Sequence, residues 1–333
     1  MNKRLWITVF AALLASASAH AANNILVASS RSNSIEEFDT TGKWLRTFAT
    51  TGPYAPVALA QSPATHEIFV TTMWASGPSA GQLTNRILRY KNDGTFDVNW
   101  DTFTIACPPQ PSVPACPTDV TQSLVFDPTG DLYVATAYGE DLGGAPIWIF
   151  RYRESDLADL NPPASGSFTA PMYRGNQMAF RKTNELCIAG FIDQDVKCFD
   201  PSTGTPTVDY YAEIHSSAVS PVIQPAGLAF DSSGMAYLTS VFGGQVLKEQ
   251  GGTFVLLAKP ATSPFQLDGN LLLQQGTGNL FTTLYSTAPV TFSSPDLVSE
   301  ISIPSGLMTS FIWGAAAPGL GNDHIWGAAW IPF

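Results

Sequence analysis

Short runs of alternating apolar and polar residues recur along the chain, and turn residues separate them. The clearest copy starts at Pro225, passes through an Asp-Ser-Ser-Gly turn to a second run ending at Ser240, and continues with runs from Gln245 and Thr253. Each run has the length and the β-branched and aromatic content of a strand. The copy therefore predicts four antiparallel strands joined by tight turns, in a unit of roughly 50 residues.

The same order of runs recurs along most of the chain. One strong copy begins at Ser123, and weaker copies span residues 55–103, 176–214 and 265–313. The N-terminal runs from Asn24 match the second, third and fourth strands but lack a first, which the final run from His324 can supply. We therefore predict an all-β, six-bladed β-propeller with four-stranded blades, closed by the C-terminal strand joining the N-terminal blade.

The first residues have the pattern of a signal peptide. Lys3 and Arg4 precede an apolar run, which ends in small residues with Ala19 and Ala21 in an Ala-x-Ala arrangement. Residues 1–21 are predicted to be removed, leaving one propeller domain over residues 22–333. No later segment approaches the roughly 18 consecutive apolar residues of a membrane helix, so membrane insertion is not expected. The bacterial periplasm is the preferred location, with the extracellular space as the alternative.

Charge and cysteine content agree with export. Without Lys3 and Arg4 the chain has 14 basic and 27 acidic residues, a net charge of −13 that opposes nucleic-acid binding. In an oxidising compartment four cysteines predict two disulfides. Cys107 and Cys116 bracket a proline-rich loop, whereas Cys187 and Cys198 lie on two strand-like runs and can face each other across a hairpin. A metal-thiolate site is disfavoured because no Cys-x-x-Cys pair occurs.

The repeat resembles the NHL repeat and the six-bladed propellers of the gluconolactonase, strictosidine-synthase-like and streptogramin-lyase families. Its Asp-x-x-Gly turns and alternating apolar strands carry this resemblance over nearly the whole mature chain. Such features serve the fold of any propeller of this kind, so the resemblance implies an architecture and not an activity.

Connection lengths predict which face of the propeller binds a ligand. Links between first and second strands and between third and fourth strands are short turns, apart from the long third-to-fourth link of the third blade. Nearly all other connections are longer and share the opposite face, which marks a binding face in repeat folds. The predicted ligand-binding residues on that face are Arg31, Asp119, Gln122, Glu140, Gln177, His215, Gln224, Asp323 and His324. The alternative role of the glutamines is to bond loop backbone, and that of the histidines is capping or packing.

These residues support two functions. The first is binding of a small molecule, glycan or peptide, which needs only shape, aromatic groups and hydrogen-bond donors. The alternative is a divalent-metal-dependent hydrolase of lactonase type, or a lyase, in which Asp119, Glu140, Asp323 and a histidine converge on the central channel around Ca²⁺ or Mg²⁺. The sequence identifies no cofactor, and it contains neither a Gly-x-Ser-x-Gly elbow nor a His-Glu-x-x-His motif.

Overall fold

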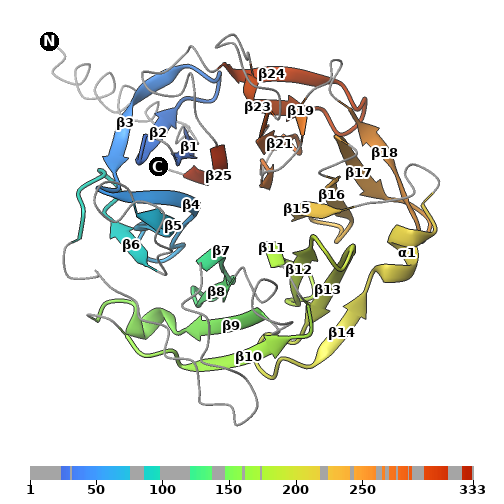
Figure 1. The fold of residues 1–333 in the computed structure, drawn as a ribbon, viewed down its shortest axis with the longest axis horizontal. Helices are drawn as coiled ribbons and strands as arrows, with labels where there is room; N and C mark the ends of the chain where they lie inside the picture. Colours follow the sequence, from blue (N-terminus) through green and yellow to red (C-terminus); the bar gives the residue numbers. More distant parts are fainter. Residues whose placement is uncertain are drawn as a thin grey trace, which may run out of the picture.

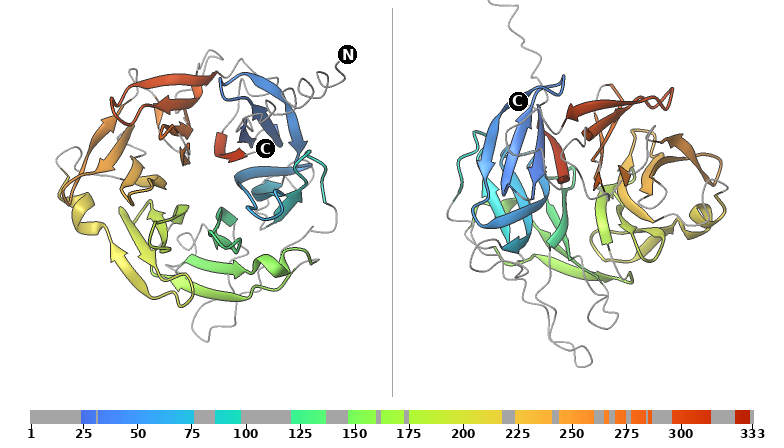
Figure 2. Two further views of the ribbon diagram at one scale, coloured as in Figure 1. Left: turned by 180° about the vertical axis from the view of Figure 1, so that it is seen from behind. Right: turned by 45° about the horizontal axis from the view of Figure 1, so that its top comes forward.

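The computed structural model describes residues 24–30, 32–75, 86–97, 121–136, 147–159, 162–172, 175–217, 224–240, 244–259, 265–266, 270–274, 277–283, 285–286, 296–313 and 325–331. Within these residues the chain forms six antiparallel sheets arranged in a ring (Figure 1). Figure 2 shows the same ring from behind and tilted. The fold is therefore a six-bladed β-propeller, as the sequence predicts.

In each blade the strands follow one another from the centre of the ring outwards. Blade 1 contains β25 (Ile325–Ile331), β1 (Asn24–Ser29), β2 (Ser34–Phe38) and β3 (Trp44–Thr50). Blade 2 contains β4 (Tyr54–Gln61), β5 (Ile68–Ala75) and β6 (Ile87–Tyr90), and blade 3 contains β7 (Thr121–Phe126), β8 (Leu132–Thr136), β9 (Ile147–Tyr152) and β10 (Gly166–Ala170). Blade 4 contains β11 (Gly175–Phe180), β12 (Leu186–Gly190), β13 (Asp195–Phe199) and β14 (Pro206–Asp209). Blade 5 contains β15 (Pro225–Phe230), β16 (Ala236–Ser240), β17 (Gln245–Glu249) and β18 (Phe254–Ala258), and blade 6 contains β20 (Leu271–Leu273), β21 (Leu280–Thr283), β23 (Asp296–Ile301) and β24 (Met308–Trp313).

Blade 1 joins the two ends of the described chain. β25 pairs antiparallel with β1, placing Ile25 opposite Trp330 and Val27 opposite Ala328. Figure 1 shows β25 beside β1 on the inner side of the ring. This pairing covers a strand edge that an open stack of blades would leave exposed. The prediction that the C-terminal run supplies the missing first strand is confirmed.

The hydrophobic core is divided among the interfaces between neighbouring blades. Leu26 of β1 packs with Leu59 of blade 2, whereas the adjacent Ile25 packs with Phe281 of blade 6. Successive side chains of a strand point to opposite faces of its sheet, and here both faces are covered by another blade. β1 is therefore buried along its whole length, because its successive side chains enter two different cores. Comparable clusters fill the other blade interfaces in the described part of the chain.

Aspartate-led turns connect many of the strands on one face. The Oδ1 atom of Asp127 accepts hydrogen bonds from the backbone N–H of Thr129 (2.8 Å), from its hydroxyl (2.7 Å) and from the N–H of Asp131 (3.0 Å). The turn ends at Gly130, whose φ of +97° suits glycine. Asp39 and Asp231 make corresponding bonds in their own turns. The Asp-x-x-Gly motif is thus a local hydrogen-bonded turn.

Glycines in the third-to-fourth strand turns press against the outer strand of the preceding blade. A Cβ atom placed on Gly94 of blade 2 would lie 2.0 Å from the carbonyl oxygen of Phe48 in β3. Gly306 of blade 6 stands in the same relation to Leu257 of β18, at 2.1 Å. Gly251 in the corresponding turn of blade 5 has no atom within 4 Å of such a Cβ. Glycine therefore allows backbone to touch backbone where the turns of blades 2 and 6 meet the preceding blade, whereas the turn of blade 5 makes no such contact.

Three local features differ from an ideal set of four-stranded blades. In blade 2 the predicted fourth run contributes a single bridge between Tyr90 and Phe96 within the described residues. In blade 6 a two-stranded ribbon, β19 (Phe265–Gln266) with β22 (Tyr285–Ser286), accompanies the main sheet. A short helix α1 (Tyr211–His215) follows β14, and a 3-10 turn at Glu154–Asp156 lies in the long link of blade 3.

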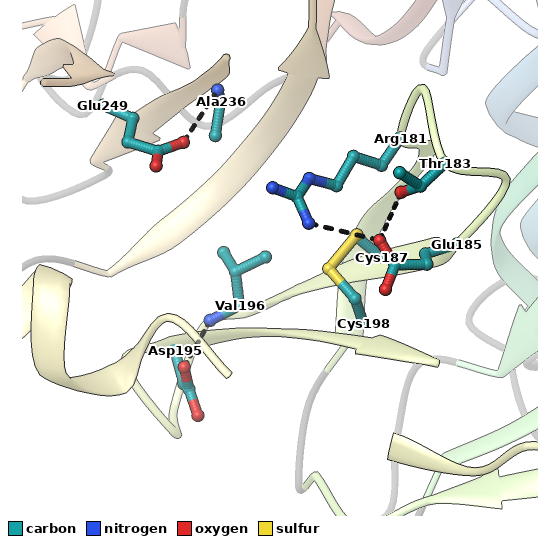
Figure 3. The surroundings of a disulfide bond; sticks show 9 residues. All are labelled: Arg181, Thr183, Glu185, Cys187, Asp195, Val196, Cys198, Ala236 and Glu249. Carbon is teal, nitrogen blue, oxygen red and sulfur yellow. Dashed lines mark hydrogen bonds and ion pairs between the residues drawn. A yellow bond between two sulfur atoms is a disulfide. The ribbon is translucent and has the colours of Figure 1, made fainter. Parts of the chain in front are cut away.

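The Cys187–Cys198 disulfide is present, as predicted. The two residues are directly opposed in the β12–β13 hairpin, with a Cα–Cα distance of 3.9 Å. Figure 3 shows the bond between the paired strands, with Arg181 and Glu185 on one side. Both cysteines are fully buried in the core shared by blades 4 and 5. The predicted Cys107–Cys116 pair lies outside the described residues.

Candidate functional site

The antiparallel topology assigns each connection to one of two faces. The strand ends joined by residues 76–85, 98–120, 137–146, 287–295 and 314–324 all lie on the face where second strands end and first strands begin. We call this the loop-rich face. The opposite, tight-turn face holds the links from first to second and from third to fourth strands. The strand bounds therefore agree with the assignment made from the sequence, including the exceptional long link of blade 3.

Gln177 on β11 connects the innermost strands of three blades. Its side-chain Oε1 accepts hydrogen bonds from the backbone N–H of Leu228 in β15 (2.9 Å) and of Leu271 in β20 (2.7 Å). Its Nε2 donates to the carbonyl oxygen of Leu271 (2.9 Å). Ser123 does the same on a smaller scale, because its hydroxyl accepts from the N–H of Met178 in the next blade (3.0 Å). In this structure the carboxamide of Gln177 is therefore engaged by strand backbone, the alternative role considered for the predicted glutamines.

Gln122, Gln177 and Gln224 do not occupy equivalent positions of the repeat. Pairing with the second strands aligns Leu124 with Met178, so that Gln177 corresponds to Ser123 and not to Gln122. Gln224 comes just before β15. The three glutamines therefore share a place near the start of a first strand but not a position of the repeat.

Four buried side-chain oxygens at the loop-rich ends of blades 5 and 6 have no hydrogen-bond partner among the described residues. They are Oε1 of Gln224, Oγ of Ser240, Oε1 of Gln245 and Oγ1 of Thr283. Ser240 ends β16, is fully buried, and is paired in the sheet with Gln245, the first residue of β17. Gln224 directly precedes β15, whose first residue pairs with Ser240. Buried polar groups in folded proteins are nearly always hydrogen-bonded, so this cluster of blade 5 has unused hydrogen-bonding capacity.

Two threonine hydroxyls at this end of the blades, in contrast, accept hydrogen bonds from strand backbone. Thr239 Oγ1 accepts from the backbone N–H of Gly227 at 2.6 Å, and Thr71 Oγ1 accepts from that of Ala58 at 3.1 Å. Both donors lie where the first strand departs from regular pairing. Thr239 therefore completes the fold of blade 5, whereas the adjacent Ser240 hydroxyl has no such task.

A second polar group on this face is a pair of carboxyl groups in blade 4. Asp195 begins β13, its side chain is almost completely buried, and it shares a hydrogen bond with Asp209 at the end of β14. Its Oδ1 accepts from the N–H of Val196 (2.6 Å), and the Lys197 ammonium lies 3.6 Å from its Oδ2. Burial, together with the neighbouring Asp209 carboxylate, raises the pKa of Asp195 to about 6. The pair thus holds a proton in mildly acidic solution.

This shift predicts a pH-dependent effect of Asp195→Asn. Aspartate in an unfolded chain titrates near pH 3.9, so folding binds a proton between about pH 4 and 6, and stability falls as the pH rises through that window. Asp195→Asn removes the titration. In thermal melts we expect the variant to match the parent at pH 4 and to have a higher Tm at pH 7.5. A lower Tm of the variant at pH 7.5 would mean that the Lys197 ion pair outweighs burial.

His215 lies away from the centre of the ring. It is the last residue of α1, which Figure 1 places at the outer edge beside blade 5. Its ring stacks on Tyr211 with centroids 3.8 Å apart, and Nδ1 is 2.8 Å from the Tyr211 carbonyl oxygen. These contacts are the capping and packing contacts that the sequence offered as an alternative to ligand binding.

Glu36 and Glu37 lie on β2, the third strand of blade 1, and serve the fold of that blade. Glu37 accepts from Asn24 Nδ2 and from Arg46 Nε, each at 2.6 Å. Glu36 accepts from Trp44 Nε1 at 2.9 Å. Both side chains are buried between blade strands and meet donors from their own blade. Neither carboxylate is available for a channel-bound metal.

The remaining predicted ligand residues fall outside the described part of the chain. These are Arg31, Asp119, Glu140, Asp323 and His324. For Gln122 the structure describes only the backbone, within β7. Among the described residues no group of three or more His, Cys, Asp or Glu side chains is arranged to hold a metal ion. In the same residues, no helix has the length and apolar character needed to cross a lipid bilayer.

Comparison with known proteins supports the fold alone. No protein-family model and no curated protein sequence matches the chain. A protein of unknown function from Bacteroides caccae is similar in structure, with a TM-score of 0.62, 15% identity, and coverage of 94% of this chain and 100% of that one. A chain of the nidogen/laminin complex has a TM-score of 0.61 at 12% identity, covering 93% and 98%. A streptogramin B lyase has a TM-score of 0.52 at 12% identity, covering 89% and 84%.

Proposed function

We propose that the protein is an exported propeller that binds a small molecule, glycan or peptide on its loop-rich face. The buried oxygens of Gln224, Ser240 and Gln245 contribute hydrogen bonds to that ligand. The observation that carries the proposal is that these three oxygens are buried at one end of one blade without a partner. Gln224 was among the residues selected from the sequence for this role.

The energetics of unpaired polar groups support this assignment. Leaving a buried donor or acceptor unsatisfied costs about 1–3 kcal/mol per group. A hydroxyl that serves only the fold would find a backbone partner, as Thr239 does next to Ser240. A bound polar ligand, or water that a ligand displaces, removes this cost. Retaining three such groups together is therefore understandable when they serve binding.

Export of the protein is part of the proposal. The N-terminal pattern with Lys3, Arg4 and Ala21 supports cleavage of residues 1–21. The buried Cys187–Cys198 disulfide supports an oxidising compartment, with the periplasm preferred over the extracellular space. The nidogen/laminin structure supports a propeller acting in a protein complex, which agrees with a peptide or protein surface among the possible ligands.

The alternative from the sequence is a metal-dependent hydrolase of lactonase type, or a lyase, in the central channel. The streptogramin B lyase supports it only at the level of fold. The residues of this chain that are predicted to bind the metal are Asp119, Glu140, Asp323 and His324, and they lie outside the described residues. Binding remains the function that the described residues support better.

Two neighbouring substitutions test whether the unpaired groups serve binding. Ser240→Ala removes an unpaired buried hydroxyl, so we expect the ligand-free variant to be more stable than the parent by about 1 kcal/mol. Thr239→Val removes a hydroxyl that accepts the Gly227 N–H, so we expect a loss of about 1–2 kcal/mol. Urea denaturation of the mature protein measures both. Equal losses in the two variants would show that Ser240 has a structural partner and would contradict the proposal.

Ligand capture completes the test. The mature protein, purified from periplasm without denaturation, is analysed by native mass spectrometry and then offered glycan and peptide libraries. We expect a ligand whose affinity falls at least about fivefold in Ser240→Ala and Gln245→Met, because each loses one hydrogen bond. Thr239→Ser, which keeps its hydroxyl, is the matched control and should bind as the parent does. A ligand insensitive to Ser240 and Gln245 would place binding elsewhere.

A further inference from the structure

A cavity of about 910 Å³ opens on the tight-turn face, opposite the proposed binding face. Its walls come from the first-to-second strand turns of blades 3, 4, 5 and 6, represented by Pro128, Asn184, Ser232 and Thr277, and from the third-to-fourth turn of blade 6 at Ile303. Its volume lies within the range of small-molecule sites, roughly 300–1,000 Å³. From the sequence, the turns that form this cavity are predicted only to connect strands.

The inner wall of the cavity is apolar and aromatic. Phe180 and Phe230, the last residues of β11 and β15, line it together with Leu273 of β20. Tyr237 of β16 adds a ring whose side chain is buried in the core between blades 5 and 6. Each of these residues belongs to a strand or its end, so the wall is held by the sheets. An apolar body of moderate size therefore finds a preformed surface here.

The charged groups of the lining are two cations and one carboxylate. The carboxylate, Asp231, is occupied: Oδ1 accepts from Ser233 and Met235 in its own turn, and Oδ2 accepts from the Tyr237 hydroxyl at 3.1 Å. Burial, with a contribution from Asp231, raises the pKa of Tyr237 to about 12, so the phenol keeps its proton and remains a donor. Both oxygens of Asp231 thus already accept hydrogen bonds from neighbouring residues of blade 5.

The two cations, Arg181 and Lys182, are adjacent in the chain. One guanidinium nitrogen of Arg181 lies 3.2 Å from Glu185, which Figure 3 shows on the side toward the disulfide. A guanidinium has five N–H donors, so this contact leaves others for a ligand. Lys182 is exposed at the cavity, and no ion pair to it occurs among the described residues. Two neighbouring cations therefore line the cavity against one carboxylate, an arrangement that favours an anion over a cation at this end.

We propose that this cavity binds a small organic anion with an aromatic or other apolar body. The anionic group faces Arg181 and Lys182, and the body packs on Phe180, Phe230 and Leu273. The site is separate from the one proposed on the loop-rich face, and it does not depend on that proposal. A carboxylate, sulfonate or phosphate ester would satisfy the same chemistry.

Anilinonaphthalene sulfonate, an aromatic anion whose fluorescence rises in apolar surroundings, is the probe for this site. We expect it to bind the folded mature protein at one site per chain. Lys182→Ala should weaken binding about fivefold, and Lys182→Glu about 20-fold, with a smaller effect at high salt. Lys91→Ala is the matched control, because Lys91 is also exposed on a tight turn, in blade 2, and should leave affinity unchanged.

The neutral analogue N-phenylnaphthylamine separates charge from shape. Its affinity should not change in Lys182→Glu, but it should fall in Ser232→Trp, which fills the cavity from an exposed position of the lining. Ser232→Trp should also abolish binding of the sulfonate. Sulfonate binding that is equal in the parent, Lys182→Glu and Ser232→Trp would overturn the proposal. Ser240→Ala should leave both probes unaffected, so that failure here is distinguishable from failure of the loop-rich site.

Discussion

Gly94→Ala is expected to destabilise the protein by about 3 kcal/mol or more, because two costs combine. Gly94 has a φ of +90°, a conformation that costs a residue with a Cβ roughly 1–2 kcal/mol. Its Cβ would also lie 2.0 Å from the carbonyl oxygen of Phe48, a buried residue of the outer strand β3, and a backbone oxygen cannot rotate away as a side chain can. Overpacking of this kind adds roughly 1–3 kcal/mol. Denaturant titration of the parent and variant measures the sum.

Gly251→Ala supplies the matched control. Gly251 occupies the corresponding turn of blade 5 with a φ of +64°, and nothing lies within 4 Å of its virtual Cβ. The variant therefore has only the cost of the positive φ, and its free energy of unfolding should fall by about 1 kcal/mol. If both variants lose the same amount, the contact between the turn of blade 2 and β3 is not tight, and this account of the blade interface is wrong.

Removing the hairpin disulfide should have the second largest effect. In the chain-entropy model a loop of this size contributes roughly 3 kcal/mol through the unfolded state, and the two sulfur atoms also fill the core between blades 4 and 5. We expect Cys187→Ala/Cys198→Ala to lower the free energy of unfolding by about 3 kcal/mol in urea titrations. The substitution is preferable to a reductant, which would also reach the predicted Cys107–Cys116 pair. A loss below about 0.5 kcal/mol would contradict the expectation.

The architecture could be predicted from the sequence because each blade repeats the same local signals. Turn residues at fixed places, such as Gly130 and Gly234, and apolar runs between them define strands and their order. The absent first run near Asn24 and the surplus run ending the chain then imply closure. Both signals are local in the chain, so a reading of one sequence detects them. The disulfide of the β12–β13 hairpin follows from the same local geometry.

The candidate sites depend on non-local relations, which explains why the sequence predicted them only in part. The sequence predicts Gln224 as a ligand-binding residue. The unpaired oxygens of Ser240 and Gln245 can be identified only when the hydrogen-bond partners of the surrounding backbone are known. The glutamines of the first strands stand at different positions of the repeat, which only the pairing with the second strands reveals. The cavity beside Lys182 requires turns of four blades to converge, although each turn by itself carries no signal beyond its own hydrogen bonds.

The pairing of β1 with β25 also determines the stage of synthesis at which the ring can close. Ile25 and Trp330 lie near opposite ends of the chain, and contacts of such sequence separation form late because closing the intervening loop costs entropy. A nascent chain lacking Ile325–Ile331 can form at most an open arc whose terminal blade has a bare strand edge, which invites aggregation. Because synthesis proceeds from the N-terminus, ring closure therefore waits for the last strand, and a chaperone that binds the open arc would protect its edge until then.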